Sequence, residues 1–367
     1  MPVRHIVDKT DEKIIHLIRP EVQALQHYHV PPSRGLIKLD AMENPYSWPA
    51  YLRGEWLEEM QSVNLNRYPD PGATGLKARL RQAFNIPAGM EVMLGNGSDE
   101  LIQIINLSLK GRDCKVMAPE PSFSMYRMIA AYAGVPFVGV PLTGDDFSLD
   151  MPAMLAAIEE HQPSVIYLSY PNNPTGNLFA EEEVEQILRA SRGLVVVDEA
   201  YTAFSGASFM ERFGEFNNLL VLRTLSKMGL AGLRLGYLVG PATWLNQFDK
   251  LRLPYNINTL TQFTAEFVLR FEDEFEEQIE QISRDRAWMS ENMRRLKGVE
   301  IFPSSANFVL FRVGKGQADR VHAILQKNGV LIKNMHGSHE LLHDCLRVTV
   351  GKPSENVAFL SALTSAL

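Results

Sequence analysis

Three polar residues stand shortly after apolar runs that the sequence predicts to be buried strands. Asn173 follows VIYLS, Asp198 follows LVVV and Lys227 follows LVLRTLS. In parallel sheets, ligands bind at the carboxyl ends of the strands. We therefore expect these three side chains to meet at one ligand site.

Lys227 has the surroundings of a nucleophilic amine. Its neighbours are mostly apolar, and Arg234 places a cation seven residues further on. An apolar pocket and a nearby positive charge both lower the pKa of a lysine. A surface lysine in a turn is the alternative for an isolated residue of this type, but the surrounding motifs favour chemistry.

Asp198 ends the most hydrophobic strand of the chain, where a carboxylate is poorly solvated and needs a cationic partner. A protonated pyridine nitrogen would serve, and sites for pyridoxal 5′-phosphate (PLP) use that pairing. Tyr201 could reach the same cofactor. The alternatives are a helix-capping role for Asp198 and ordinary packing for Tyr201.

Gly97, Ser98 and Asp99 follow a predicted strand and open a predicted helix. A helix N-terminus presents free backbone N–H groups and the positive end of its dipole, which suits a phosphate. A plain N-cap by Ser98 or Asp99 is an equally good interpretation of this short segment.

The elements that would position these residues alternate between helix and strand. Helical apolar spacing covers 74–84, 100–109, 123–133, 151–160 and 181–191, and strand-like runs cover 91–95, 115–118, 137–140, 165–169, 194–197 and 219–224. Such alternation is typical of an α/β fold whose mostly parallel sheet is covered on both faces.

The last third of the chain changes character. A long, bent or broken helix is predicted over 259–296, followed by strands and a helix at 308–312, 318–328, 330–333 and 346–350. We expect a large α/β domain over 45–262. We expect a smaller α+β domain over 263–367, with the N-terminal segment 1–44 packed near it.

Composition excludes several classes of protein. The chain has 367 residues, which suggests about two domains, and a net charge of −7 without a long basic run, which argues against a nucleic-acid binder. Cys114 and Cys345 are expected to be reduced thiols. No apolar run is long enough for a membrane span, so a cytoplasmic enzyme is expected.

Several motifs together resemble the fold type I, class II-like aminotransferases that use PLP, and in particular the histidinol-phosphate aminotransferases. The motifs are LDAMENPY at 39–46, RYPD at 67–70, GNGSDE at 95–100, PNNPTG at 171–176, DEAY at 198–201, TLSK at 224–227 and GLRLGY at 232–237. The resemblance extends over nearly the whole chain.

The resemblance implies a role for each cofactor residue. Lys227 would hold PLP as a Schiff base and move a proton, Asp198 would bind the pyridinium nitrogen, and Asn173 with Tyr201 would bind the ring oxygen. The remaining implied contacts are an aromatic stack by Phe123, a phosphate contact by Tyr68 of a partner subunit in a homodimer, and phosphate contacts by Gly97, Ser98, Asp99, Thr224, Ser226 and Arg234.

The resemblance also implies substrate contacts. Arg347 would bind the phosphate of the substrate, and Lys333, Asn44 and Tyr28 are further candidates. The implied reaction interconverts L-histidinol phosphate plus 2-oxoglutarate and imidazole-acetol phosphate plus L-glutamate, in histidine biosynthesis.

The sequence departs from the family pattern in four ways. Lys333 stands where many members have arginine, Met42 replaces an asparagine, and Phe123 stands where tyrosine is common. The spacing from Lys227 to Arg234 is one residue shorter than in many aminotransferases, so the turn between them must be tighter.

Three other activities stay open on the same scaffold. A broad aromatic amino-acid aminotransferase would share almost every cofactor residue, and a phosphoamino-acid decarboxylase would share the fold. A non-catalytic ligand-sensing protein is the alternative from another class, and the intact pair Lys227 and Asp198 argues against it.

Overall fold

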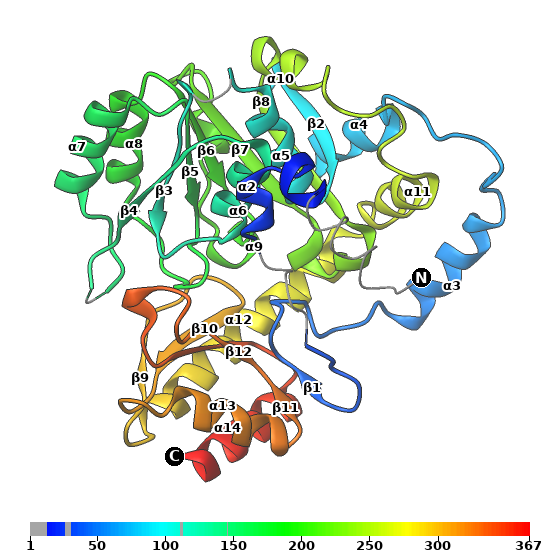
Figure 1. The fold of residues 1–367 in the computed structure, drawn as a ribbon. Coiled ribbons are helices and arrows are strands. Elements are labelled where there is room, and N and C mark those ends of the chain that lie inside the picture. Colours follow the sequence, from blue (N-terminus) through cyan, green and yellow to red (C-terminus); the bar gives the residue numbers. More distant parts are fainter. Residues whose placement is uncertain (1–12, 26–30, 111–112, 145) are drawn as a thin grey trace, which may run out of the picture.

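A computed structural model describes residues 13–25, 31–110, 113–144 and 146–367, which we call the described residues (Figure 1). Two bodies are visible, a large one around an extended sheet and a smaller one that contains the C-terminus. The long helix α12 (Glu272–Arg294) runs between them.

The large sheet is mixed but mostly parallel. Its strands lie in the order β2-β8-β7-β6-β5-β3-β4. They are β2 (Met90–Asn96), β3 (Val116–Glu120), β4 (Phe137–Pro141), β5 (Val165–Ser169), β6 (Leu194–Asp198), β7 (Leu219–Thr224) and β8 (Leu235–Pro241). Strands β3 to β7 are parallel, as the alternating pattern predicts, whereas β8 is antiparallel to both of its neighbours and was not predicted as a strand.

Helices cover both faces of this sheet. One face carries α5 (Ser98–Ser108), α6 (Met125–Ala133) and α10 (Ala242–Phe248). The other face carries α4 (Thr74–Ala83), α7 (Met151–His161), α8 (Glu181–Ala190) and α11 (Thr259–Val268). The helix α3 (Ala50–Met60) also packs on this second side, through Leu52.

The alternation of side chains along β6 decides how the site is built. Leu194 and Val196 belong to the apolar core beneath α5 and α6, and Val195 and Val197 belong to the core beneath α4, α7 and α8. Successive side chains in a strand point to opposite faces. The residue at 198 therefore continues the first face, and the residue at 199 continues the second.

The small body has its own sheet and its own apolar core. Its strands are β9 (Glu300–Ile301), β10 (Phe308–Arg312), β12 (Lys333–Asn334) and β13 (Cys345–Thr349), in the antiparallel order β12-β13-β10-β9. The helices α13 (Ala318–Lys327) and α14 (Pro353–Ala366) pack against each other.

The predicted long helix is broken at residues 269–271, between α11 and α12. The N-terminal segment contains α2 (Pro20–Gln23) and β1 (Ile37–Lys38), and β1 pairs in parallel with β11 (Val330–Leu331). This pairing joins the end of the N-terminal segment to the second unit, and the division into 45–262 and 1–44 with 263–367 stays our proposal.

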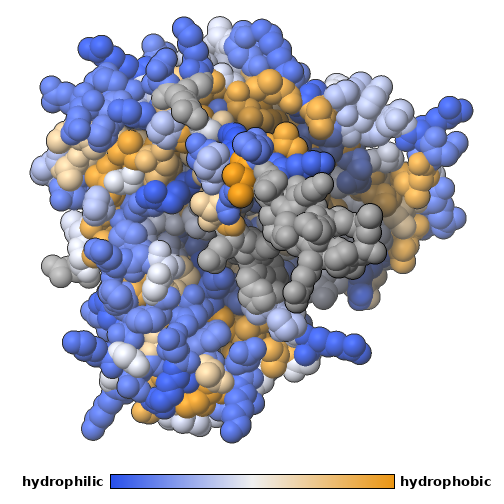
Figure 2. Space-filling view, viewed as in Figure 1, coloured by the Kyte–Doolittle hydropathy of each residue, from blue (hydrophilic) through white to orange (hydrophobic). Residues whose placement is uncertain are grey.

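Hydrophilic residues cover much of the face shown in Figure 2, and the hydrophobic residues lie there in separate groups. Within the described ranges, none of the helices combines the length and the apolar character that crossing a membrane requires. Cys114 and Cys345 are free thiols, as expected.

Candidate active site

Residues from five elements surround one cavity of about 100 Å³ at the carboxyl edge of the large sheet. The cavity lies where β5, β6 and β7 end and α5 begins. Its wall is formed by Met42, Ser98, Asp99, Phe123, Ser169, Asn173, Asp198, Ala200, Tyr201, Thr224, Ser226, Lys227 and Arg234. Asn173, Asp198 and Lys227 thus meet at one site.

Lys227 lies in the short 3₁₀ helix η3 (Ser226–Met228) that follows β7. Its Nζ is 3.3 Å from the carbonyl oxygen of Ala41 and 5.7 Å from the centre of the Tyr201 ring. Burial, together with the positive charge of Arg347, lowers the pKa of Lys227 to about 8. The amine is therefore much closer to its neutral, nucleophilic form at neutral pH than an exposed lysine is.

Asp198 is a buried carboxylate at the end of β6. Burial raises its pKa to about 7, against the opposing effect of hydrogen bonds from the Tyr126 hydroxyl at 2.7 Å and the Ala200 amide at 3.2 Å. Within the described part of the chain, no cationic side chain forms an ion pair with Asp198. The site thus offers a carboxylate for which a cation inside the cavity would be the missing partner.

A chain of hydrogen bonds joins the cavity to the small body. The Nδ2 of Asn173 donates to the Tyr201 hydroxyl at 3.0 Å, and Nη1 of Arg347 donates to the Oδ1 of Asn173 at 2.5 Å. Nη2 of Arg347 also donates to the backbone oxygen of Asp40 at 3.1 Å. Arg347 lies on β13, so the N-terminal segment, the large sheet and the small sheet meet at this side chain.

The N-terminus of α5 forms an open cradle at one end of the cavity. Gly97 has a φ of 79°, a left-handed conformation that side chains rarely adopt. A Cβ on Gly97 would lie 2.6 Å from Nη2 of Arg234, and a Cβ on Gly236 would lie 2.5 Å from the backbone nitrogen of Ser98. The two glycines keep this backbone N–H and the guanidinium close together, as a bound anion requires.

Two hydroxyls complete the cradle. The Thr224 hydroxyl donates to the Ser226 Oγ at 2.9 Å, and both residues line the cavity. The carboxylate of Asp99 lies 3.6 Å from Arg234, and burial raises its pKa. Phe123 lies in the same wall, edge-on to Tyr126 with ring centres 5.5 Å apart.

Besides Gly97 and Arg347, which lie next to the cavity wall, four sequence candidates lie outside it or outside the described residues. Tyr68 is 80% exposed and stacks on Tyr255. Asn44 bonds the backbone of Met228 and the side chain of Gln278, and lines a neighbouring cavity. Lys333 lies directly opposite Arg347 on the adjacent strand.

The fourth of these candidates is Tyr28, which lies outside the described residues. Met42, one of the departures from the family pattern, is part of the cavity wall.

Sequence reasoning missed Tyr126, which is wholly buried and touches Asp198 directly. It lies in a run of apolar residues, SMYRMIAAYA, and its spacing there is that of a core residue. The available signal was its position three residues after Phe123 in the stretch 123–133 that the sequence predicts to be helical, although the helix itself begins at Met125.

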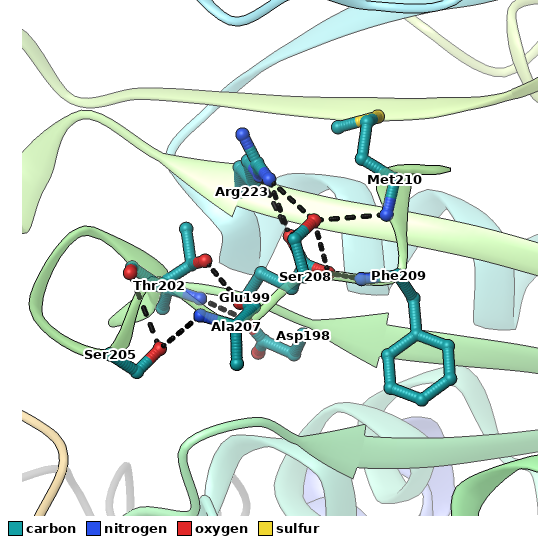
Figure 3. A network of polar contacts seen from close by, with 10 residues as sticks. Asp198, Glu199, Thr202, Ser205, Ala207, Ser208, Phe209, Met210 and Arg223 are labelled. Carbon is teal, nitrogen blue, oxygen red and sulfur yellow. Dashed lines mark hydrogen bonds and ion pairs between the residues drawn. The ribbon is translucent and has the colours of Figure 1, made fainter. Parts of the chain in front are cut away.

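A second missed cluster lies behind the cavity. The carboxylate of Glu199 accepts from Nε of Arg223 at 2.8 Å, from the Ser208 hydroxyl at 2.9 Å and from the Phe209 amide at 2.5 Å. Figure 3 shows these groups gathered around Glu199, with Asp198 lying apart from them. Glu199 and Arg223 are 24 residues apart, so no local pattern predicts the pair.

Comparison with known proteins places this geometry in context. The profile of the family described as aminotransferase class I and II matches residues 34–363. The histidinol-phosphate aminotransferase 2 of Nitrosococcus oceani is 52% identical over 96% of this chain and 98% of its own length. The histidinol-phosphate aminotransferase of Chromobacterium violaceum is 52% identical over 95% of this chain and 97% of its own.

A solved structure shows the same fold. The histidinol-phosphate aminotransferase of Sinorhizobium meliloti, in complex with pyridoxal-5′-phosphate, superposes with a TM-score of 0.85 at 23% identity. The match covers 95% of this chain and 97% of that one. The expected fold type I architecture is thereby confirmed.

Proposed function

The chain belongs to the class I and II aminotransferase family, and from that premise we propose that it is a histidinol-phosphate aminotransferase. The proposed reaction interconverts L-histidinol phosphate plus 2-oxoglutarate and imidazole-acetol phosphate plus L-glutamate, with PLP as cofactor. The proposed setting is histidine biosynthesis in the cytoplasm. One observation carries the chemistry: Lys227 and Asp198 face the same cavity beside an anion cradle.

The residues present fit PLP. Asp198 is a buried carboxylate with no cationic partner in the described part of the chain, and the N–H⁺ of a pyridinium ring would supply one. Gly97 and Gly236 leave the Ser98 amide and Arg234 available to a phosphate group. When bound, PLP supplies an electron sink that lets the substrate carbon next to the nitrogen lose a proton.

The chain's own residues hold the cofactor and move that proton. Lys227 would bond the cofactor covalently through its amine, and would later carry the proton to and from the substrate carbon. Its lowered pKa suits this exchange, because a base works best when its pKa lies near the working pH. Asn173 and Tyr201 would fix the ring oxygen, and Phe123 would cover the ring face.

The residues of the cradle would bind the phosphate group of the cofactor. Arg234 would donate in a fork, and the Thr224 and Ser226 hydroxyls with the amides from Gly97 to Asp99 would complete the contacts.

Arg347 is the proposed contact for the substrate's phosphate. It is buried at the inner end of the site, and Lys333 lies opposite it in the register of β12 and β13. Burial and the charge of Arg347 lower the pKa of Lys333. A dianionic phosphate near both side chains would offset the repulsion between them and favour the charged form of the lysine. Asn44 and Tyr28 remain secondary candidates for substrate contact.

The proposed assembly is a homodimer in which Tyr68 reaches the cofactor phosphate of its partner. Exposed apolar residues close in sequence to Tyr68 and to its stacking partner Tyr255 support such an interface: Leu65 is 68% exposed and Leu253 is 72% exposed. Tyr255 holds the Tyr68 ring by stacking, with ring centres 4.4 Å apart. Clustered exposed apolar side chains of this kind mark protein interfaces.

A spectroscopic titration tests the proposal. The purified protein with PLP is titrated with L-histidinol phosphate and, separately, with tyrosine, phenylalanine and glutamate, while the visible absorbance of the bound cofactor is followed. We expect histidinol phosphate to act at far lower concentration than the aromatic amino acids. Lys227→Ala is the control, and it should bind PLP without the covalent absorbance change.

Each alternative has its own outcome. Equal or better response to the aromatic amino acids would make the protein a broad aromatic aminotransferase. Binding of PLP without amino transfer to any keto acid would indicate a ligand sensor. A wild-type protein that shows no cofactor absorbance with added PLP would overturn the whole proposal.

A further inference from the structure

Tyr126 contacts Asp198 directly through a side-chain hydrogen bond. Its hydroxyl donates to Oδ2 of Asp198 at 2.7 Å, while the Ala200 amide bonds Oδ1 at 3.2 Å. A carboxylate offers about four acceptor positions on its two oxygens, so acceptor capacity remains for a group inside the cavity. The tyrosine bond crosses 72 residues of sequence and joins α6 to the end of β6.

The ring of Tyr126 has little freedom. It is 1% exposed and stacks on Tyr167 with ring centres 4.8 Å apart and planes 10° from parallel. The edge of Phe123 meets it from the cavity side, at 5.5 Å and 85°. Packing on these two sides holds the hydroxyl in one position. A residue can orient another side chain only when its own conformation is fixed in this way.

Tyr167 offers a natural comparison. It is equally buried and stacked, but its hydroxyl donates to Oδ1 of Asn106 at 2.8 Å instead of to Asp198. The two tyrosines thus share their packing and differ in the acceptor of one hydrogen bond. Each carries a pKa well above its usual range because it is buried, so both hydroxyls remain donors at neutral pH.

We propose that Tyr126 is a positioning residue that keeps Asp198 ionised and aimed at the pyridine nitrogen of the cofactor. The inference rests on the proposed function, because it presumes that a pyridinium ring occupies the cavity. A hydrogen bond to a carboxylate favours the charged form, and here that bond comes from a rigid donor in a buried site.

The groups around Asp198 determine in which direction its pKa should change when the Tyr126 hydroxyl is removed. They are Tyr126 from α6, Tyr167 from β5, Asp99 from α5 and the chain neighbour Glu199, with Lys227 and Arg234 in the same cavity wall.

The two acidic neighbours oppose ionisation of Asp198, and the Tyr126 hydroxyl favours it. Removing the hydroxyl should therefore raise the pKa of Asp198. The pH below which Asp198 loses its charge should rise with it.

The test compares Tyr126→Phe with Tyr167→Phe. Each variant loses one buried hydroxyl, and the affinity of the apoprotein for PLP is measured as a function of pH beside the kcat/KM for amino transfer. For Tyr126→Phe we expect the acidic limb of both profiles to move upward by about one pH unit, the typical worth of a hydrogen bond to a charged group. Tyr167→Phe should leave both limbs in place.

Thermal unfolding separates positioning from stability. Both variants should lose a similar amount of stability, because each leaves a buried acceptor with one partner fewer. In an Asp198→Asn background, Tyr126→Phe should cause no further shift of the acidic limb. Should Tyr126→Phe fold poorly, the pH profile of PLP affinity for the folded fraction still reports the shift.

The outcomes distinguish this inference from the proposed function. A wild type that binds no PLP and transfers no amino group removes the premise itself. A wild type that works, with superimposable acidic limbs in the two tyrosine variants, shows that Tyr126 only packs the core.

Discussion

Asp198 and Glu199 are neighbours in the chain but lie in opposite surroundings. Asp198 faces the cavity, bonds a hydroxyl and an amide, and has no cationic partner among the described residues. Glu199 faces the other side of the sheet edge, where Arg223, Ser208 and the Phe209 amide satisfy it completely. The strand alternation seen in β6 separates the two carboxylates.

The difference between the two carboxylates shows that one strand end can both stabilise the fold, through Glu199, and supply a functional group to the cavity, through Asp198. The far-side pair joins the end of β6 to β7, because Glu199 follows Asp198 and Arg223 precedes Thr224. The segments that carry Asp198 and Lys227 are thereby tied together from behind. On the cavity side, Asp198 can then stay without an ion-pair partner among the described residues, which would be costly without such support.

The largest effect on turnover should come from the cavity side. With Asp198→Asn, we expect the kcat to fall by roughly 10²- to 10³-fold at saturating PLP, because the amide cannot stabilise a pyridinium charge. Stopped-flow or steady-state assays of amino transfer would measure it.

Although Asp198→Asn should lower the kcat, it should leave the stability of the apoprotein unchanged or raise it. A folded-state pKa of about 7, above the unfolded value, means that ionised Asp198 costs the apoprotein stability as the pH rises through 4 to 7. The apoprotein variant should therefore unfold at the same or a higher temperature than wild type at pH 8. A clear loss of stability there would contradict the picture of Asp198 as an unpaired carboxylate.

Glu199→Gln should have the opposite pattern, with a large loss of stability and little change in kcat. Breaking a buried ion pair leaves Arg223 without its counter-charge, and we expect a loss of roughly 3–5 kcal/mol in the free energy of unfolding. Below the unfolding temperature, the kcat should change only a few-fold. Denaturant unfolding and initial rates, measured on the same sample, would test both expectations. A kcat loss as large as that of Asp198→Asn would show that Glu199 is not limited to a structural role.

Cofactor uptake should depend on pH through the cavity side alone. Lys227 must be neutral to attack the cofactor, and its pKa is about 8, so the rate of uptake by the apoprotein should rise by about tenfold between pH 7 and pH 9. Rapid-mixing absorbance would follow it. Ser208→Ala should keep this profile, and a rise of about a hundredfold in wild type, as for a lysine of ordinary pKa, would refute the lowered pKa of Lys227.

The smallest effect should come from Ser208→Ala. Its hydroxyl bridges Glu199 and Arg223 and accepts from the Met210 amide, but the ion pair itself remains. We expect a loss of about 1 kcal/mol in stability and an unchanged kcat. A larger loss, seen in the denaturation midpoint, would mean that the serine rather than the arginine holds the far-side cluster together.

Much of the fold was predictable because its strands are short and apolar. The buried runs at 165–169, 194–197 and 219–224 match β5, β6 and β7 closely. Strand β8 was missed because LGYLVGP contains two glycines and ends in proline, residues that weaken a strand pattern. Its antiparallel direction depends on the chain reversal through η4 (Ala231–Leu233), which no periodicity reveals.

The site was predictable where its chemistry lies in contiguous motifs. Asp198 ends a strand, and Lys227 and Asn173 each follow one, so their common location follows from parallel pairing. Tyr126 and Arg223 were missed because each acts on a residue distant in the sequence, and each sits in an apolar run where packing is the ordinary interpretation. Asn44 occurs in a family motif, yet its bonds go to the protein's own backbone and to Gln278.

The absence of a side chain at residue 236 has a consequence for anyone who wishes to diversify this enzyme. The glycine lies on β8, between β2 and β7, where a library would readily include alanine or serine. Even a methyl group there would lie 2.5 Å from the Ser98 nitrogen and press on the turn that begins α5. Combinatorial redesign of substrate preference should therefore leave position 236 constant and vary the small-body strands around Arg347, which approach the cavity from outside the large sheet.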